Sequence, residues 1–414
     1  MDYNREYMTR SVKLISNLIF LSCSAFAQDV PFTVSSITLK GGLVASEYTN
    51  TISATGTATV VGLGDAAIVM SGIAARERGF NCANFEQFSI KFNFTPTDSL
   101  TAQFVAPPLT GPSLTAKFNA VSTTGFLLAG RGGNGTINLT IQVAADGTFN
   151  ATGSAAGTLT TKLVPVATIQ PSGIVPVYSS VPVVQPGSWF SVYGSNFTGT
   201  TSVWNNDFPT SLGGVTVTVN GRPAYLWFVS PGQINVQAPD DRPNACAEVV
   251  VTTQNGTVKS GVTLNTSQPS FNLLDSKYAA VVILTPDGSG AYGGGTYDLA
   301  GPVGRFPYPT RPVKVGETVS LYGVGFGPTS QIVPAGQLFP GPATQLLSYP
   351  GVTIGGVRAQ VSFAGLVGAG LYQINLTMPP LPSGDQVLSA NVGGGVPLGP
   401  GAGNSPGGVY IPVK

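Results

Sequence analysis

The chain has 414 residues, of which 42% are hydrophobic and only 9% charged, with a formal net charge of +1 and no histidine. A chain of this length exceeds one ordinary core and indicates two or three domains. The absence of histidine excludes Ser-His-Asp and Cys-His catalysis and most zinc sites. The balanced charge gives nucleic acid no electrostatic attraction. Abundant Gly and Pro beside normal hydrophobic content are typical of short strands joined by tight turns.

The N-terminus has the pattern of a secretory signal peptide. Arg10 and Lys13 precede a mostly apolar run over 14–26, and Ala25-Phe26-Ala27 is a small-x-small cleavage site. The run is too short to span a membrane, and the residues before Cys23 fit a lipoprotein signal poorly. We therefore expect cleavage near Ala27 and a protein without a membrane span, either secreted or held at the cell surface or in the periplasm.

Residues 28–165 are predicted to form an N-terminal β-domain, either a sandwich or a barrel. In its clearest strand, 136–143, apolar and polar side chains alternate with period two. Asp146-Gly147 then turns the chain into a strand over 148–161, because Asp-Gly between alternating strands favours a hairpin. One short helix is expected around 65–75. Further strands are expected at 32–39, 52–61, 88–94, 100–105 and 114–118.

Two more domains are predicted, at 166–268 and 269–414. In the first, several short strands are joined by tight turns, and Asn220-Gly221 suits a type I′ turn because both central residues need positive φ. Seven or so strands in about 100 residues is the pattern of an immunoglobulin-like sandwich. In the second, glycine-rich and proline-rich loops precede the repeat described next, and 409–413 is expected to be a closing strand.

One phrase occurs twice in these two domains. Residues 186–197 contain Phe-Ser-Val-Tyr-Gly-Ser-Asn-Phe, and residues 315–326 contain Val-Ser-Leu-Tyr-Gly-Val-Gly-Phe. Each is followed by a hairpin, a Gln-Ile-Asn strand (233–235 and 373–375) and a proline, which predicts two copies of one β-module. The offset between copies grows from 129 residues at the tyrosines to 140 at the glutamines, so the second copy has longer loops.

This order of strand, Gly-x-Asn-Phe turn, Gly-Gly-Val strand, Asn-Gly hairpin, Ile-Asn-Val strand and proline resembles the IPT/TIG family of immunoglobulin-like domains. The phrases at 212–217, 229–239 and 370–375 are similar to an uncharacterised C-terminal region of secreted acidobacterial proteins. The resemblance covers about 170–414 and implies tandem sandwiches in an exported bacterial protein. It supplies no functional residues, because that region has no established activity.

Aromatic side chains are the best candidates for ligand contact. Trp204 lies in a polar loop and, with Trp189 and Tyr193, is a candidate platform on which the apolar face of a sugar could stack. Trp227 lies in a hairpin strand and is expected to serve packing instead. The glycine-rich turns at 194–197 and 323–326 are expected to be turns rather than phosphate cradles, because no helix follows either of them.

Acidic residues are few and give weak signals. Asp207 and the pair Asp240-Asp241 are insufficient for calcium, which takes six to eight oxygen ligands, so we expect solvated loops there. Glycoside hydrolysis needs only two positioned carboxylates and no histidine. A glycoside hydrolase that uses two of the carboxylates of Glu77, Glu86 and Asp98 therefore remains an alternative.

Two cysteines, Cys82 and Cys246, remain after cleavage. We expect two separate thiols, although a disulfide between them is allowed in an exported protein.

The sequence thus predicts an exported, non-enzymatic, all-β protein without a metal or cofactor, in which a separate sandwich or barrel precedes two tandem immunoglobulin-like sandwiches. The expected role is structural, adhesive or binding, at the cell surface or in the matrix, with a polysaccharide or another surface protein as partner. The alternative is a secreted carbohydrate-active enzyme or its carbohydrate-binding accessory. Specificity is expected in 28–165 or in the unrepeated loops.

Overall fold

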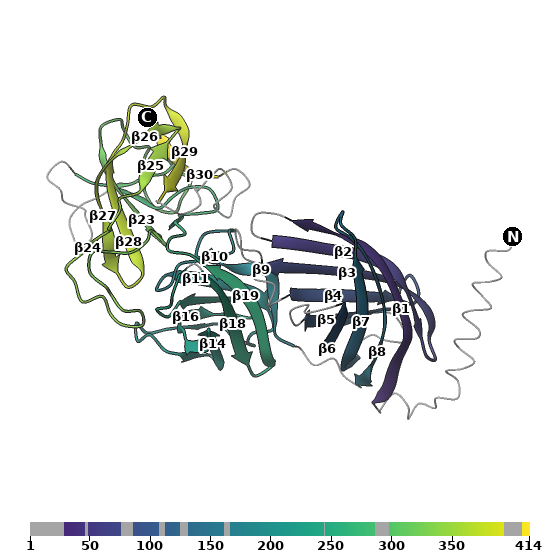
Figure 1. Ribbon diagram of the computed structural model, residues 1–414. Helices are drawn as coiled ribbons and strands as arrows, with labels where there is room; N and C mark the ends of the chain where they lie inside the picture. The colour runs from purple at the N-terminus through teal and green to yellow at the C-terminus, as the bar shows by residue number, and fades with distance from the viewer. Residues whose placement is uncertain are drawn as a thin grey trace. The chain divides into compact units, whose positions relative to one another are not determined.

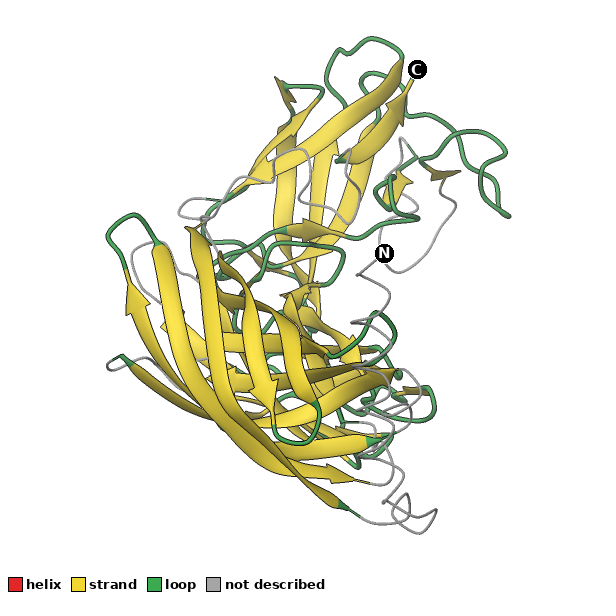
Figure 2. Cartoon of the chain, turned by 90° about the vertical axis from the view of Figure 1, so that its right-hand side faces the viewer, coloured by secondary structure: helices red, strands yellow, loops and turns green. Residues whose placement is uncertain are grey.

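The computed structural model describes residues 29–45, 49–75, 86–106, 112–124, 131–160, 166–243, 245–285, 298–392 and 408–414. Every regular element in these ranges is a β-strand (Figure 2), which confirms the all-β prediction. In the same ranges no helix has the length and apolarity needed to cross a membrane. The chain divides into two compact units, Met1–Val166 and Ala167–Lys414. The predicted signal peptide lies outside the described residues.

The first unit is a closed barrel of eight antiparallel strands in chain order, in which the last strand pairs with the first (Figure 1). Side chains alternate between the two faces of each strand. The inward positions carry a continuous core of Phe, Ile, Leu, Val, Met and Ala, while the outward ones are mostly Thr, Ser and Asn. The strands are Val30–Ala45 (β1), Thr49–Val60 (β2), Gly64–Ala75 (β3), Glu86–Asn93 (β4), Ser99–Ala106 (β5), Ser113–Thr124 (β6), Gly132–Val143 (β7) and Thr148–Thr160 (β8).

The helix expected around 65–75 is wrong, because this segment is strand β3. It pairs with β2 on one side and β4 on the other. Ala66, Ile68 and Met70 are buried in the barrel, and the residues between them face outward with period two. Alanine favours a helix in isolation, but here two neighbouring strands satisfy the backbone, so tertiary pairing outweighs local propensity.

The second unit begins with a β-sandwich built from a six-stranded sheet and a five-stranded sheet around one core. The six-stranded sheet has the order β10-β19-β18-β14-β13, with β15 beside β14, and the five-stranded sheet has the order β12-β16-β17-β11-β9. Its strands are Thr168–Pro176 (β9), Val183–Val184 (β10), Trp189–Ser195 (β11), Ser202–Val203 (β12), Ser211–Leu212 (β13), Val215–Val219 (β14), Arg222–Pro223 (β15), Tyr225–Val229 (β16), Gln233–Gln237 (β17), Ala245–Thr253 (β18) and Gly256–Leu264 (β19).

A second sandwich follows, with a seven-stranded sheet and a four-stranded sheet around its own core. The sheet orders are β22-β21-β23-β28-β27-β24, with β20 beside β23, and β26-β25-β29-β30. The predicted closing strand is confirmed as β30. The strands are Ser270–Phe271 (β20), Val281–Ile283 (β21), Asp298–Leu299 (β22), Thr318–Val324 (β23), Thr344–Gln345 (β24), Gly351–Ile354 (β25), Val357–Arg358 (β26), Gln360–Gly368 (β27), Leu371–Thr377 (β28), Gly384–Asn391 (β29) and Val409–Val413 (β30).

The repeated Tyr-Gly-x-x-Phe phrase is a packing motif of both sandwiches. A side chain on Gly194 or Gly323 would collide with the ring of the phenylalanine three residues later, Phe197 or Phe326. Both rings are fully buried. Glycine is required here because a backbone carbonyl of the neighbouring strand, that of Thr168 or Ser270, and the phenylalanine ring both lie directly against it. The repeated phrase therefore marks a packing contact of the core.

The repeated Gln-Ile-Asn phrase also has a structural cause. It lies in a central strand, β17 or β28, and its polar side chains face away from the core toward a serine of the neighbouring strand. In each sandwich the asparagine Oδ1 accepts hydrogen bonds from that serine and from the glutamine. The donors and distances are Ser191 at 2.8 Å and Gln233 at 2.8 Å for Asn235, and Ser320 at 2.7 Å and Gln373 at 2.8 Å for Asn375.

The predicted hairpin turns are confirmed by their backbone angles. Asn220-Gly221 has φ of 50° and 76°, and Gly355-Gly356 has φ of 57° and 80°, as a type I′ turn requires. The expectation of two separate thiols is wrong at Cys246, because this residue is disulfide-bonded. Cys82 lies outside the described residues.

Candidate functional site

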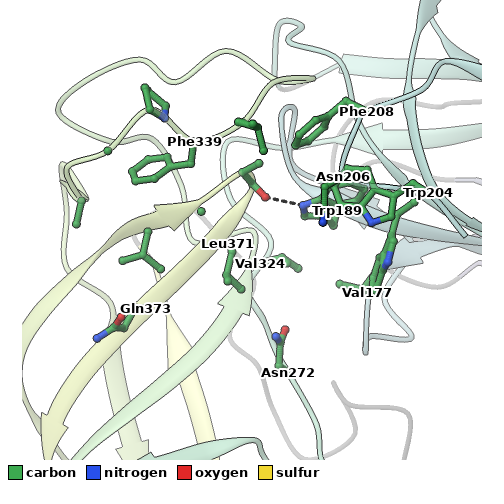
Figure 3. A pocket seen from close by; sticks show the side chains of 18 of the residues that line it. Val177, Trp189, Trp204, Asn206, Phe208, Asn272, Val324, Phe339, Leu371 and Gln373 are labelled. Atoms are coloured by element: carbon green, nitrogen blue, oxygen red, sulfur yellow. Dashed lines mark hydrogen bonds between the residues drawn. The ribbon is translucent and has the colours of Figure 1, made fainter. Parts of the chain in front are cut away.

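A hollow of about 960 Å³ lies between the two sandwiches of the second unit, and we call it the aromatic groove (Figure 3). The first sandwich supplies one wall and the second sandwich the other, and none of the lining residues is charged. The first wall consists of Val177, Tyr178, Trp189, Trp204, Asn206, Phe208 and Trp227. The second consists of Asn272, Val324, Leu338, Phe339, Pro340, Gly341, Ala343, Phe363, Val367, Gly368, Ala369, Leu371, Gln373 and Asn375.

Trp189 is the centre of the aromatic cluster on the first wall. Its ring lies 5.4 Å from that of Trp204 and 5.9 Å from that of Trp227, at interplanar angles of 78° and 75°. Trp204 in turn meets Phe208 edge-to-face at 4.6 Å. Trp189 is only 8% exposed, whereas Trp204 and Trp227 are half-buried. Edge-to-face packing therefore fixes the last two rings while leaving part of their surface open to the groove.

Strand pairing explains why Trp204 and Trp227 lie side by side. The short strand β12 pairs with β16, and just beyond it the backbone N–H of Trp204 donates to the carbonyl of Trp227 at 2.9 Å. Within the pairing of β16 and β17 the register shifts between Leu226 and Phe228. This irregularity falls at Trp227, and irregularities of this kind re-aim a side chain.

Direct hydrogen bonds join the two walls. The indole Nε1 of Trp189 donates to the carbonyl of Ala369 at 2.6 Å, which satisfies the polar atom of this buried ring. The buried hydroxyl of Ser270 donates to the carbonyl of Val177 at 2.7 Å. Each bond runs from one sandwich to the other, so the groove has walls that are tied together.

A buried triad beside the groove strengthens this connection. Gln185 of the first sandwich accepts from the N–H of Gly327 at 2.7 Å and donates to the hydroxyl of Tyr372 at 3.0 Å. Tyr372 donates to the carbonyl of Gly327 at 2.7 Å, and burial raises its pKa to about 12. Buried polar groups that lose these hydrogen bonds would destabilise the protein, so the triad favours one fixed arrangement of the sandwiches.

Amide side chains of the second sandwich line the groove. Gln373 is only 5% exposed, and its Nε2 is bound to Asn375, which leaves its Oε1 as an acceptor. The Oδ1 of Asn375 is taken by Ser320 and Gln373, which leaves its Nδ2 as a donor. Asn272 adds a half-buried amide to the same wall. The groove thus combines aromatic surface with neutral donors and acceptors.

The three predicted ligand-binding residues do not all meet at this site. Trp189 and Trp204 are brought together in the groove, but Tyr193 is absent from its lining and pairs with Gln233 farther along β11. Trp227, expected to serve packing alone, also lines the groove. Phe339 was missed because it lies in a loop without periodicity. The one signal that pointed to it was the greater length of the second copy.

The carboxylate of Asp98 has a structural role in the barrel. It accepts hydrogen bonds from the hydroxyls of Thr95 at 2.7 Å and Thr97 at 3.4 Å, and the backbone N–H of Asp98 donates to the Thr95 hydroxyl at 2.8 Å, in the turn between β4 and β5. Glu77 and the side chain of Glu86 lie outside the described residues, so the hydrolase alternative stays untested.

The candidate calcium ligands also cap loops. Asp207 accepts from the N–H of Asn205 at 3.1 Å, and Asp241 accepts from the amide of Asn220 at 2.8 Å. Within the described ranges, no three His, Cys, Asp or Glu residues gather as a metal site would require.

Comparisons with known proteins give no family for this chain. No family model and no curated protein matches it. One similar solved structure is SGBP-B of the Bacteroides ovatus mixed-linkage glucan utilization locus, in complex with a mixed-linkage heptasaccharide. It is 13% identical with a TM-score of 0.26, over 76% of this chain and 64% of that one. Another is the N-terminal eight immunoglobulin domains of Down Syndrome Cell Adhesion Molecule isoform 1.30.30, 9% identical with a TM-score of 0.14, over 94% and 58%. Likenesses this low carry no argument about function.

Proposed function

We propose that the protein is an exported, non-enzymatic binding protein of the cell surface that holds a carbohydrate chain in the aromatic groove. The observation that carries this proposal is the composition of the groove. Trp204 and Trp227 offer ring surface on one wall, Gln373 and Asn375 offer free amide atoms on the other, and no lining side chain is charged.

The chemistry of sugars matches these two walls. A pyranose ring has an apolar face of C–H groups, which stacks on an aromatic ring, and a rim of hydroxyl groups, which donate and accept hydrogen bonds. A purely apolar ligand would leave the amides of Gln373 and Asn375 desolvated without partners. The volume of about 960 Å³ lies at the upper end of ordinary ligand sites and leaves room for several sugar rings.

The rigid connection of the walls supports binding in a second way. A ligand that must first order its site loses affinity to the entropy of that ordering. Here the bonds from Trp189 to Ala369 and from Gln185 to Gly327 and Tyr372 already hold the two sandwiches in place. Binding energy is then available for the ligand itself.

A glycan array followed by titration calorimetry tests the proposal. The probes are neutral glucans, mannans and xylans, mixed-linkage β-glucan among them. We expect the wild type to bind at least one probe, and Trp204→Ala to bind it at least about tenfold more weakly, since stacked aromatic contacts dominate binding energy. Tyr349→Ala removes an exposed aromatic side chain outside the groove lining and should bind like the wild type. No binding to any probe, or equal binding by Trp204→Ala, would contradict the proposal.

A further inference from the structure

Part of the second wall of the aromatic groove is built by a long loop, residues 327–343, which we call the arm. It lies between the Tyr-Gly-x-x-Phe phrase and the hairpin of the second sandwich. This interval runs from Tyr193 to Asn220 in the first copy and from Tyr322 to Gly355 in the second, which makes it 27 and 33 positions long. The arm is therefore a place where the second copy departs from the first.

The arm is anchored on the opposite sandwich. The N–H of Ala335 donates to the carboxylate of Asp240 at 3.1 Å, and the N–H of Gly336 donates to Oε1 of Gln237 at 3.0 Å. Gly336 has a φ of 78°, and a side chain there would run into the ring of Tyr225. Only glycine allows the backbone to lie this close to Tyr225. Ala335 and Gly336 therefore form a close-fitting anchor.

Beyond the anchor, the arm turns into the groove. Figure 3 shows Phe339 on the side of the groove opposite Trp204 and Phe208. Phe339 is also packed against the core of the second sandwich, whereas Leu338 is 69% exposed. The arm is thus held at the anchor on one sandwich and at Phe339 on the other, and the residues between them connect the two sandwiches.

We propose that the anchored arm makes the groove selective for linear, unbranched neutral glycans. This inference rests on the proposed function, because it assigns a ligand class to the same groove. A wall fixed at both ends cannot retreat to admit a side branch unless the anchor opens. Opening breaks two hydrogen bonds, and one of them leaves Oε1 of Gln237, a side chain that is only 2% exposed, without its partner. A linear chain requires no such opening.

Matched pairs of oligosaccharides test the selectivity. Linear and galactose-branched mannan oligosaccharides form one pair, and linear and xylose-branched glucan oligosaccharides form the other. The affinities of the wild type, Gly336→Ala and Asp240→Ala are measured by calorimetry. Gly304→Ala is the control, because Gly304 has a φ of 76° and open space around it, so it reproduces the backbone strain without the collision.

For the pair whose linear member binds, we expect the wild type and Gly304→Ala to prefer it by about tenfold or more. Gly336→Ala and Asp240→Ala should bind the linear member more weakly and reduce this preference at least about threefold. Asp240→Ala changes an exposed side chain, so it keeps the test valid if Gly336→Ala fails to fold. Equal affinity for both members, or unchanged preference in both anchor variants, would overturn the inference while leaving carbohydrate binding intact. Failure of the wild type to bind any member of the two pairs and any probe of the glycan array would overturn the proposed function itself.

Discussion

The two sandwiches of the second unit share their central strands but differ in the segments between them. Each buries a phenylalanine against a glycine, and each pairs a serine with the asparagine of its Gln-Ile-Asn strand. The second copy is longer both before and after its hairpin, and those intervals contain Phe339 of the arm and Phe363 of β27, which line the groove. The repeated residues are therefore those that stabilise the fold of each sandwich, and the segments that differ between the copies are where a site can form.

The largest expected effect tests whether the two copies are equivalent as folds. Phe197→Ala and Phe326→Ala should each lower the free energy of unfolding by about 3–5 kcal/mol, because each removes a fully buried ring and leaves a cavity. Chemical denaturation followed by circular dichroism measures both. Val357→Ala, at a partly exposed position of β26, is the control and should change stability by less than about 0.5 kcal/mol. A small loss in only one of the two phenylalanine variants would break the equivalence.

A smaller effect is expected at a position where the copies differ. Tyr372 precedes the Gln-Ile-Asn phrase of the second copy, and Gly232 stands there in the first. Tyr372→Phe should cost about 1–3 kcal/mol at neutral pH, because it removes the buried hydroxyl bound to Gln185 and Gly327. Thermal unfolding measures the loss. A stability equal to that of the wild type would show that the triad does not hold the sandwiches together.

The same tyrosine predicts a pH dependence. Its pKa is raised from 10.0 to about 12 in the folded protein, so the unfolded chain loses this proton first as the pH rises. The stability contribution of the neutral phenol is complete below pH 10 and is lost between about pH 10 and 12. Denaturation across this range should show a steeper loss for the wild type than for Tyr372→Phe. If the two proteins lost stability in parallel across this pH range, the buried hydroxyl of Tyr372 would not be the cause of the pH dependence.

Asn235 and Asn375 separate a shared structural role from a role in binding. Each accepts the same pair of hydrogen bonds, so Asn235→Ala and Asn375→Ala should both cost about 1 kcal/mol of stability. Only Asn375 lines the groove, so only Asn375→Ala should weaken glycan binding, by about threefold to tenfold. Calorimetry with the glycan identified on the array measures both affinities. Equal weakening in the two variants would place the effect in the fold and not in the site.

The smallest effects are expected from ion pairs on the surfaces of the two sandwiches. Lys259 and Glu248 pair at 3.2 Å in the first, and Lys277 and Asp385 pair at 2.7 Å in the second. All four side chains are about a third exposed or more, so solvent and salt screen both pairs. Lys259→Ala and Lys277→Ala should each change stability by less than about 1 kcal/mol. A larger loss at Lys277 would show that its contacts with Tyr278 and Tyr410 matter more than its charge.

Local sequence patterns predicted those parts of the fold that depend on local physics. Period-two alternation identified the barrel strand at 136–143, and the pair Asn220-Gly221 identified a turn that needs positive φ. The pattern failed at β3, where alanines at both inward and outward positions look helical until two neighbouring strands are present. Closure into a barrel, rather than a sandwich, depends on the distant pairing of β1 with β8, which no local pattern encodes.

The candidate site was only partly predictable for the same reason. Trp204 was recognised because it lies in a polar loop, and Trp189 because its ring was a candidate for the same aromatic platform. They line a groove only because the second sandwich supplies the facing wall, and no periodicity in the sequence reports how two sandwiches pack. Phe339 lies in an irregular loop rich in Gly and Pro, so only the length difference between copies drew attention to its neighbourhood.

The pairing of β1 with β8 has a consequence for how the first unit forms. Val30 in β1 meets Leu159 in β8, about 130 residues later, so the barrel cannot close until nearly the whole unit has been synthesised. Contacts this distant in the chain slow folding, because the entropy of closing a long loop is lost before the pairing stabilises it. A fragment ending before Thr148 would leave β1 and β7 as open edges, free to pair with other chains. Pairing of β8 therefore determines whether the first unit closes into a barrel or exposes strand edges that promote aggregation.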